Sequence, residues 1–201
     1  MADMATSAIS PGRRRVWSLP VRLLHWGLAA SIVAAWCTTV WGVSWHAAFG
    51  WSVLACLGTR LAWGWVGPPP ERMAALWNLC RRPMDVWMYA RDMVRNSSTE
   101  MPPSGHNPMG ACMVVALWLT ALTTGLSGWV LSTDRYWGDE LWAFVHTTGA
   151  WGLVALVGLH VAGVLWTGQR RRVCWVRTMI DGVPEPQPRQ DSRSTPSSSQ
   201  A

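Results

Sequence analysis

Four of the five histidines lie within or beside long apolar runs, where an imidazole needs a partner. They are His25, His46, His146 and His160. Ionisable side chains inside a membrane are costly and usually functional. Imidazole is a common axial ligand of haem iron, and two axial imidazoles leave no open coordination position. Histidines that pair at these positions would therefore favour electron transfer over oxygen binding.

The spacing within the last apolar run supports paired sites. His146 and His160 are 14 residues apart. A helix rises about 1.5 Å per residue with about 3.6 residues per turn, so the two side chains would be about 21 Å apart on nearly the same face. One helix can thus present one ligand to each of two stacked haems. Glycines in the last two runs allow close approach of a flat macrocycle, although plain helix packing also explains them: Gly125, Gly128, Gly149, Gly152, Gly158 and Gly163.

Four apolar segments have the length needed to position these ligands across a bilayer. A hydrocarbon core of about 30 Å needs about 20 residues of helix. Backbone polar groups in lipid must be satisfied internally, which favours helices, and the runs lack the alternation of a β-barrel. The sequence predicts an all-α integral membrane four-helix bundle with a loop between helices 2 and 3. Its spans are about Leu23–Val43, His46–Val66, Met109–Leu131 and Leu141–Thr167.

The arginines predict the orientation of these spans. The chain has no lysine, so its 17 positive charges are all arginines. They concentrate before the first span, in the loop 67–108 and after the fourth span. The positive-inside rule places these three segments, and so both termini, in the cytoplasm. His25 then lies at the depth of His160 near the cytoplasm, and His46 at the depth of His146 near the periplasm.

Facing helices of a bundle commonly build cofactor sites. We therefore expect two haem b groups, each with iron held by two histidines: His25 with His160, and His46 with His146. The two irons would lie about 20 Å apart along the membrane normal.

Two further residues have open interpretations. Arg60 lies near the cytoplasmic end of the second span. It either snorkels to the interface or contacts a haem propionate, because a guanidinium at that depth needs an anion or water. His106 precedes Pro108 at the start of the third span, and turn chemistry explains this segment. A contact from His106 to a propionate or a quinone is the alternative.

Composition excludes several classes of protein. Half of the residues are hydrophobic and 14% are charged, against about 25% charged in soluble domains. The 17 tryptophans suit membrane interfaces. The net charge of +6 would suggest nucleic acid in a soluble protein, but here the arginines flank apolar runs, so we expect no nucleic acid partner. The five cysteines show no c-type haem attachment pattern, disulfide framework or zinc site.

A single membrane domain is expected over residues 16–182. Residues 1–15 form a lead and residues 183–201 a tail rich in Ser, Pro and Gln, and both are expected to be disordered. The segment Pro83–Arg95 has helical spacing of apolar residues and is expected to lie in the membrane interface.

Four segments of the chain resemble the bacterial cytochrome b561 family. The resemblance is close to the b-type cytochrome subunits of nickel–iron hydrogenases. The matching segments are residues 16–26, 60–68, 105–110 and 159–163. The resemblance implies four transmembrane helices in the bacterial cell inner membrane, two b haems and quinone-linked electron transfer. It carries haem ligation onto the four histidines that topology selects. The chain departs from the family at Thr38-Thr39, where relatives often have Thr-Gly, and at Ala47-Ala48-Phe49-Gly50, where relatives commonly carry an acidic residue.

Three functions remain open at this stage. The first links a quinone pool to a redox partner protein, such as a hydrogenase or a soluble cytochrome, by electron transfer through the bilayer. The second is a stand-alone oxidoreductase that takes electrons from a small periplasmic reductant such as superoxide, with Arg135 in the donor site, and reduces quinone. The third is a small transporter with a histidine-lined path and no haem, although four spans are few and no internal repeat is present. A homodimer is compatible with each of them, and whether the chain is itself an enzyme stays open.

Overall fold

Helices make up nearly all of the chain that the computed structural model describes, which is residues 17–95 and 108–182. No strand occurs in these two ranges, and the all-α prediction is confirmed. The predicted lead and tail, residues 1–15 and 183–201, lie outside the described residues. The elements are α1 Leu19–Cys37, η1 Thr38–Val40, α2 Val43–Val66, η2 Pro69–Glu71, α3 Met73–Cys80, α4 Pro83–Val94, α5 Pro108–Leu131, α6 Glu140–Arg171 and α7 Trp175–Asp181.

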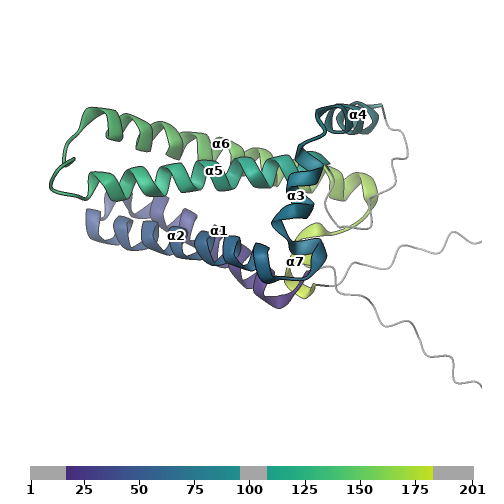
Figure 1. The fold of residues 1–201 in the computed structure, drawn as a ribbon, viewed down its shortest axis with the longest axis horizontal. Coiled ribbons are helices and arrows are strands. Elements are labelled where there is room, and N and C mark those ends of the chain that lie inside the picture. Colours follow the sequence, from purple (N-terminus) through teal and green to yellow (C-terminus); the bar gives the residue numbers. More distant parts are fainter. Residues whose placement is uncertain (1–16, 96–107, 183–201) are drawn as a thin grey trace, which may run out of the picture.

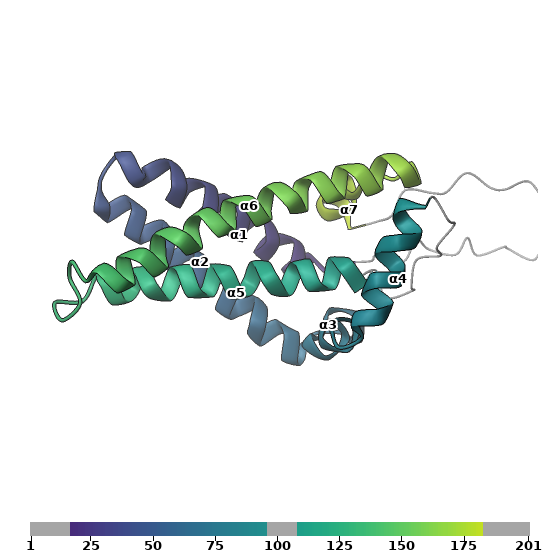
Figure 2. The same ribbon diagram turned by 90° about the horizontal axis from the view of Figure 1, so that it is seen from above.

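Four long helices lie side by side along one axis (Figures 1 and 2). Helix α1 packs against α2, α2 against α5, and α5 against α6. The turn between α1 and α2 and the loop between α5 and α6 lie at one end, which we call the loop end. Helices α3, α4 and α7 lie at the opposite end, which we call the terminal end because α1 begins and α7 ends there (Figure 1).

Three helices in the described ranges are long and apolar enough to cross a membrane: Leu19–Val40, Pro108–Leu131 and Glu140–Arg170. They correspond to the first, third and fourth predicted spans. Helix α2 corresponds to the second predicted span. It is as long as α5, at 24 residues. It is not among the candidate spans. Its apolar character is diluted by polar residues: Ser44, His46, Ser52, Thr59 and Arg60.

The first two helices are joined by a very short connection. The Thr38 hydroxyl donates to Ala34 O at 2.7 Å near the end of α1. Gly42 then adopts φ 124° and ψ 148°, a backbone conformation that strongly favours glycine, and α2 begins at the next residue. The first helix therefore ends at Cys37, earlier than the sequence predicts, and the second starts earlier.

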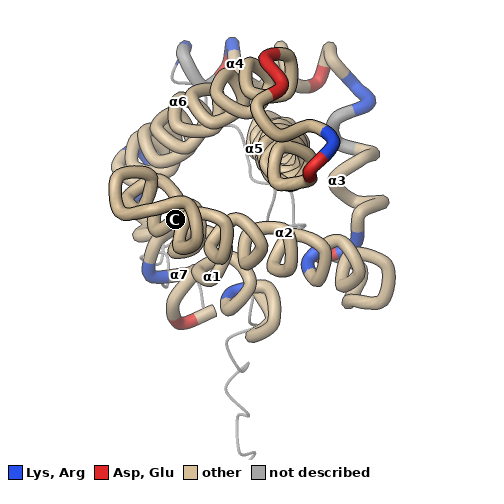
Figure 3. Tube along the Cα trace, turned by 90° about the vertical axis from the view of Figure 1, so that its left-hand side faces the viewer, with Lys and Arg blue, Asp and Glu red and all other residues tan. Residues whose placement is uncertain are grey.

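The apolar core lies where α2, α5 and α6 meet. Leu57 is 0% exposed and packs with Val53, Ala121 and Leu153. Many other large apolar side chains point outward, including Trp41, Trp51 and Phe144. Figure 3 shows that charged residues are sparse along the long helices. An outer surface of this kind suits contact with lipid rather than water.

A buried carboxylate fastens the terminal end. Glu71 is 2% exposed. Its Oε1 accepts a hydrogen bond from the Ser18 backbone N–H at 2.6 Å. Its Oε2 accepts from the Ser18 hydroxyl and from Trp63 Nε1, both at 2.8 Å. This Glu71 cluster joins the start of α1, the end of α2 and η2.

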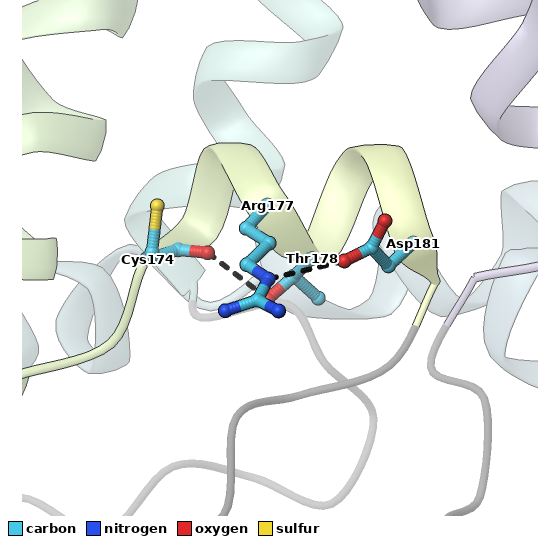
Figure 4. A network of polar contacts seen from close by, with 4 residues as sticks. All are labelled: Cys174, Arg177, Thr178 and Asp181. Atoms are coloured by element: carbon cyan, nitrogen blue, oxygen red, sulfur yellow. Dashed lines mark hydrogen bonds and ion pairs between the residues drawn. The ribbon is translucent and has the colours of Figure 1, made fainter.

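Short helices cover the terminal end. Helix α7 folds back on α1, where Trp26 Nε1 donates to Met179 O at 3.3 Å. Within α7, Arg177 Nε pairs with Asp181 Oδ2 at 3.1 Å, and the Thr178 hydroxyl donates to Cys174 O at 3.3 Å (Figure 4). Helix α4 confirms the predicted helix at Pro83–Arg95 and lies across the axis of the long helices (Figures 1 and 2).

We expect Glu71→Gln to lower Tm in detergent. The amide replaces one acceptor oxygen with a donor, which leaves a Ser18 or Trp63 hydrogen unsatisfied. An unsatisfied buried group costs about 1–3 kcal/mol, or about 2–12 °C at this chain length. Asp181→Asn is the control, because it breaks only an exposed ion pair, which contributes little. Equal Tm values for the two variants would contradict the proposed role of the Glu71 cluster.

Candidate cofactor site

The structure brings the four histidines of the long helices together in two pairs. The rings of His25 on α1 and His160 on α6 have centroids 6.4 Å apart. The rings of His46 on α2 and His146 on α6 have centroids 5.9 Å apart. These are the two pairs that spacing and topology predict. Their role as ligands remains a prediction.

Both pair separations suit two ligands on opposite sides of one metal ion. An imidazole nitrogen binds a metal at about 2.0–2.1 Å, so two trans imidazoles have centroids about 6 Å apart. In the described ranges, no cluster of three or more His, Cys, Asp or Glu side chains could hold a metal. Each pair offers two imidazoles, and these residues fit a group that supplies the remaining iron ligands itself, such as a haem.

Helix α6 separates the two pairs along the molecule. His146 lies near its start at the loop end, and His160 lies 14 residues further along. Leu153 of the apolar core is midway between them in sequence. The rings of Trp36 on α1 and Trp151 on α6 also meet, with centroids 5.0 Å apart. The core side chains around Leu153 therefore lie between the two histidine pairs along the molecule.

In the pair at the loop end, the Nδ1 atom of each ring is hydrogen-bonded to a backbone carbonyl. His46 Nδ1 lies 2.8 Å from Ala35 O, and His146 Nδ1 lies 2.9 Å from Thr124 O. A carbonyl oxygen only accepts, so each Nδ1 must donate its hydrogen. In the neutral ring this leaves the Nε2 lone pair free to bind a metal. Such a hydrogen bond to the second nitrogen is typical of metal-binding histidines.

Gly128 on α5 makes room for one of these rings. A Cβ at Gly128 would lie 2.9 Å from Cε1 and 3.1 Å from Nδ1 of His146. The neighbouring Ser127 hydroxyl lies 3.4 Å from the same Nδ1 and donates to Thr124 O at 3.0 Å. Among several glycines on α5 and α6, Gly128 is the one against the His146 ring.

Arg60 is buried rather than extended to the surface, with 8% of the residue exposed. Its Nη2 donates to Glu71 O at 3.3 Å, and its guanidinium lies 5.1 Å from the centre of the Trp118 ring. Its Nη1 is buried without a hydrogen-bond partner among the described residues. The structure therefore does not show the snorkelling arrangement. His106 lies outside the described residues.

Comparison with known proteins gives one match. A family model described as prokaryotic cytochrome b561 matches residues 16–182. No curated protein and no solved structure matches the chain.

We expect Gly128→Ala to displace the His146 ring and weaken its bond to Thr124 O. The expected loss is about 1–3 kcal/mol, seen as a Tm lower by about 2–12 °C in detergent. Gly58→Ala on α2 is the matched control, because a Cβ there meets nothing within 4 Å. Equal Tm values for the two variants would show that Gly128 does not shape the site.

Proposed function

Because the chain belongs to the prokaryotic cytochrome b561 family, we propose that it links a quinone pool to a redox partner protein through two b haems. The match confirms the resemblance that the four sequence segments indicate. The family binds haem b and acts in transmembrane electron transfer, and its match with the apolar helices identifies a membrane protein. The number of haems, their ligands and the partners belong to the proposal.

The observation that carries the proposal is the presence of two histidine pairs, each with one member on α6. His25 and His160 would hold one haem, and His46 and His146 the other. A bound haem supplies an iron that gains and loses one electron. Each pair of imidazoles would hold one iron and exclude other ligands, and the backbone carbonyls at Ala35 and Thr124 would orient the rings of His46 and His146.

The layer between the two pairs supports electron transfer over transport. Leu57, Val53, Ala121 and Leu153 pack together at this level, and Leu57 is fully buried. A histidine-lined path for protons or ions would need polar groups or water through this layer. An apolar layer blocks ions, but electrons tunnel through it.

The path of the chain supports a fourth crossing by α2. A Cβ on Gly182 would lie 3.1 Å from Trp17 O, so the two ends of the described chain are neighbours. Chain ends on the same side require an even number of crossings, and three candidate spans are already counted. The multi-pass arrangement then has four spans. The arginines near the terminal end favour a cytoplasmic location for it in a bacterial inner membrane.

The loop end does not favour superoxide as the donor. Arg135 is exposed there and lies against the Tyr136 ring, 5.3 Å from its centre. Three carboxylates accompany it in the loop and at the start of α6: Asp134, Asp139 and Glu140. Their negative charge would repel an anion. A protein partner such as a hydrogenase or a soluble cytochrome therefore remains the proposed second partner, and a homodimer is also compatible with the fold.

Haem counting tests the ligand assignment. We expect two haem b per chain in the purified protein, measured by pyridine haemochrome. His25→Ala or His160→Ala should leave one, and so should His46→Ala or His146→Ala. His106→Ala should keep two, because this histidine has no proposed axial role. A colourless protein, or two haems retained in any axial variant, would falsify the assignment.

Arg60 is proposed to contact a haem propionate. Its buried Nη1 has no acceptor in the part of the chain that the structure describes, and a carboxylate would supply one. We expect Arg60→Met to bind two haems initially but to lose one at least tenfold faster to an apoprotein acceptor, measured by absorbance. Arg60→Lys should retain most of the slow rate, because it keeps the charge. Unchanged loss in Arg60→Met would exclude the contact.

A further inference from the structure

The two histidine pairs differ in whether their ring nitrogens form hydrogen bonds with the protein. Both members of the loop-end pair, His46 and His146, donate from Nδ1 to backbone carbonyls at 2.8 and 2.9 Å. The His25 ring contacts the rings of Trp26 and His160. Neither His25 nor His160 forms a hydrogen bond within the described chain. The asymmetry involves both members of each pair.

Such hydrogen bonds change how strongly an imidazole donates to a metal. An acceptor at Nδ1–H raises the basicity of the other nitrogen. A more basic axial ligand stabilises the ferric state more than the ferrous state and so lowers the reduction potential. Hydrogen bonding around the axial ligand is one of the main ways in which a protein tunes haem iron.

Burial and charge do not oppose this difference. All four histidines are partly buried. Among the described residues, the buried charged side chains at the terminal end are Arg60 and Glu71, which are of opposite sign and adjacent. Surface charges act in the same direction, because arginines gather at the terminal end and Asp134, Asp139 and Glu140 lie at the loop end. The carbonyl hydrogen bonds therefore add to a difference of the same sign.

We propose that the His46/His146 site has the lower reduction potential and the His25/His160 site the higher one. This inference rests on the proposed function, in which each pair holds one haem. The electron lost by one site is gained by the other, so the exchange needs no further reductant and no proton. Downhill transfer then runs from the loop end to the terminal end. We expect an equilibrium constant of at least about 10 for this transfer. It corresponds to a difference in reduction potential of about 59 mV for one electron.

Ser127 provides a way to change one site without removing a ligand. Its hydroxyl is buried and donates to Thr124 O, the carbonyl that also accepts from His146 Nδ1. Two donors that share one oxygen weaken each other. Ser127→Ala should therefore strengthen the His146 bond and make its site more negative. Ser52→Ala is the matched control, because Ser52 makes a similar bond to Ala48 O on the exposed face of α2.

The test is a potentiometric titration of the full-length holoprotein in detergent, followed by the absorbance of the reduced haem. The wild type should show two one-electron waves. His160→Ala should keep only the lower wave, and His146→Ala only the upper wave. Ser127→Ala should shift the lower wave to more negative potential and leave the upper wave in place. Ser52→Ala should shift neither.

The opposite assignment in the single-site variants, or equal potentials in both, overturns the proposal. If those variants do not fold, Ser127→Ala decides alone, and a shift of the upper wave or of neither wave overturns it. Wild-type protein with fewer than two haems would instead refute the proposed function. The two failures are therefore distinguishable by haem content.

Discussion

A buried imidazole in an apolar helix needs a partner, and this need organises the whole structure. Helix α6 places His146 and His160 on nearly the same face, 14 residues apart. The two remaining long helices that carry histidines must deliver one ring to each of these levels. The tight turn at Gly42 and the Glu71 cluster fix α1 and α2 at opposite ends, so that His25 and His46 arrive at the two levels.

The result is a layered interior with an apolar layer between two polar ones. Leu57 and Leu153 belong to the middle layer, and one ring pair lies on each side of it. An arrangement of this type would hold the two proposed haems at fixed separation and keep water away from the centre. The layering follows from the positions of histidines and leucines along α6, and the other helices complete it.

Much of this arrangement could be predicted from the sequence, because apolar length and helix periodicity determine the levels of the histidines. Other features depend on contacts that residue type does not encode. Glu71 follows three prolines and shows no periodic pattern, so its burial against Ser18 and Trp63 was not predicted. The carbonyls of Ala35 and Thr124 are equally hidden, since every residue carries one. Helix α2 is less apolar than the sequence predicts, because it carries Ser52, Thr59 and Arg60 along its length.

Each carbonyl bond at the loop end is made within one helical hairpin. His46 bonds to Ala35 across the turn between α1 and α2, and His146 bonds to Thr124 across the loop between α5 and α6. Each hairpin can therefore orient its own imidazole as soon as it has inserted, before the other hairpin is present. During biogenesis, each hairpin would then carry one oriented imidazole of the loop-end pair from the start. The last step of assembly would be the joining of the two hairpins around a tetrapyrrole.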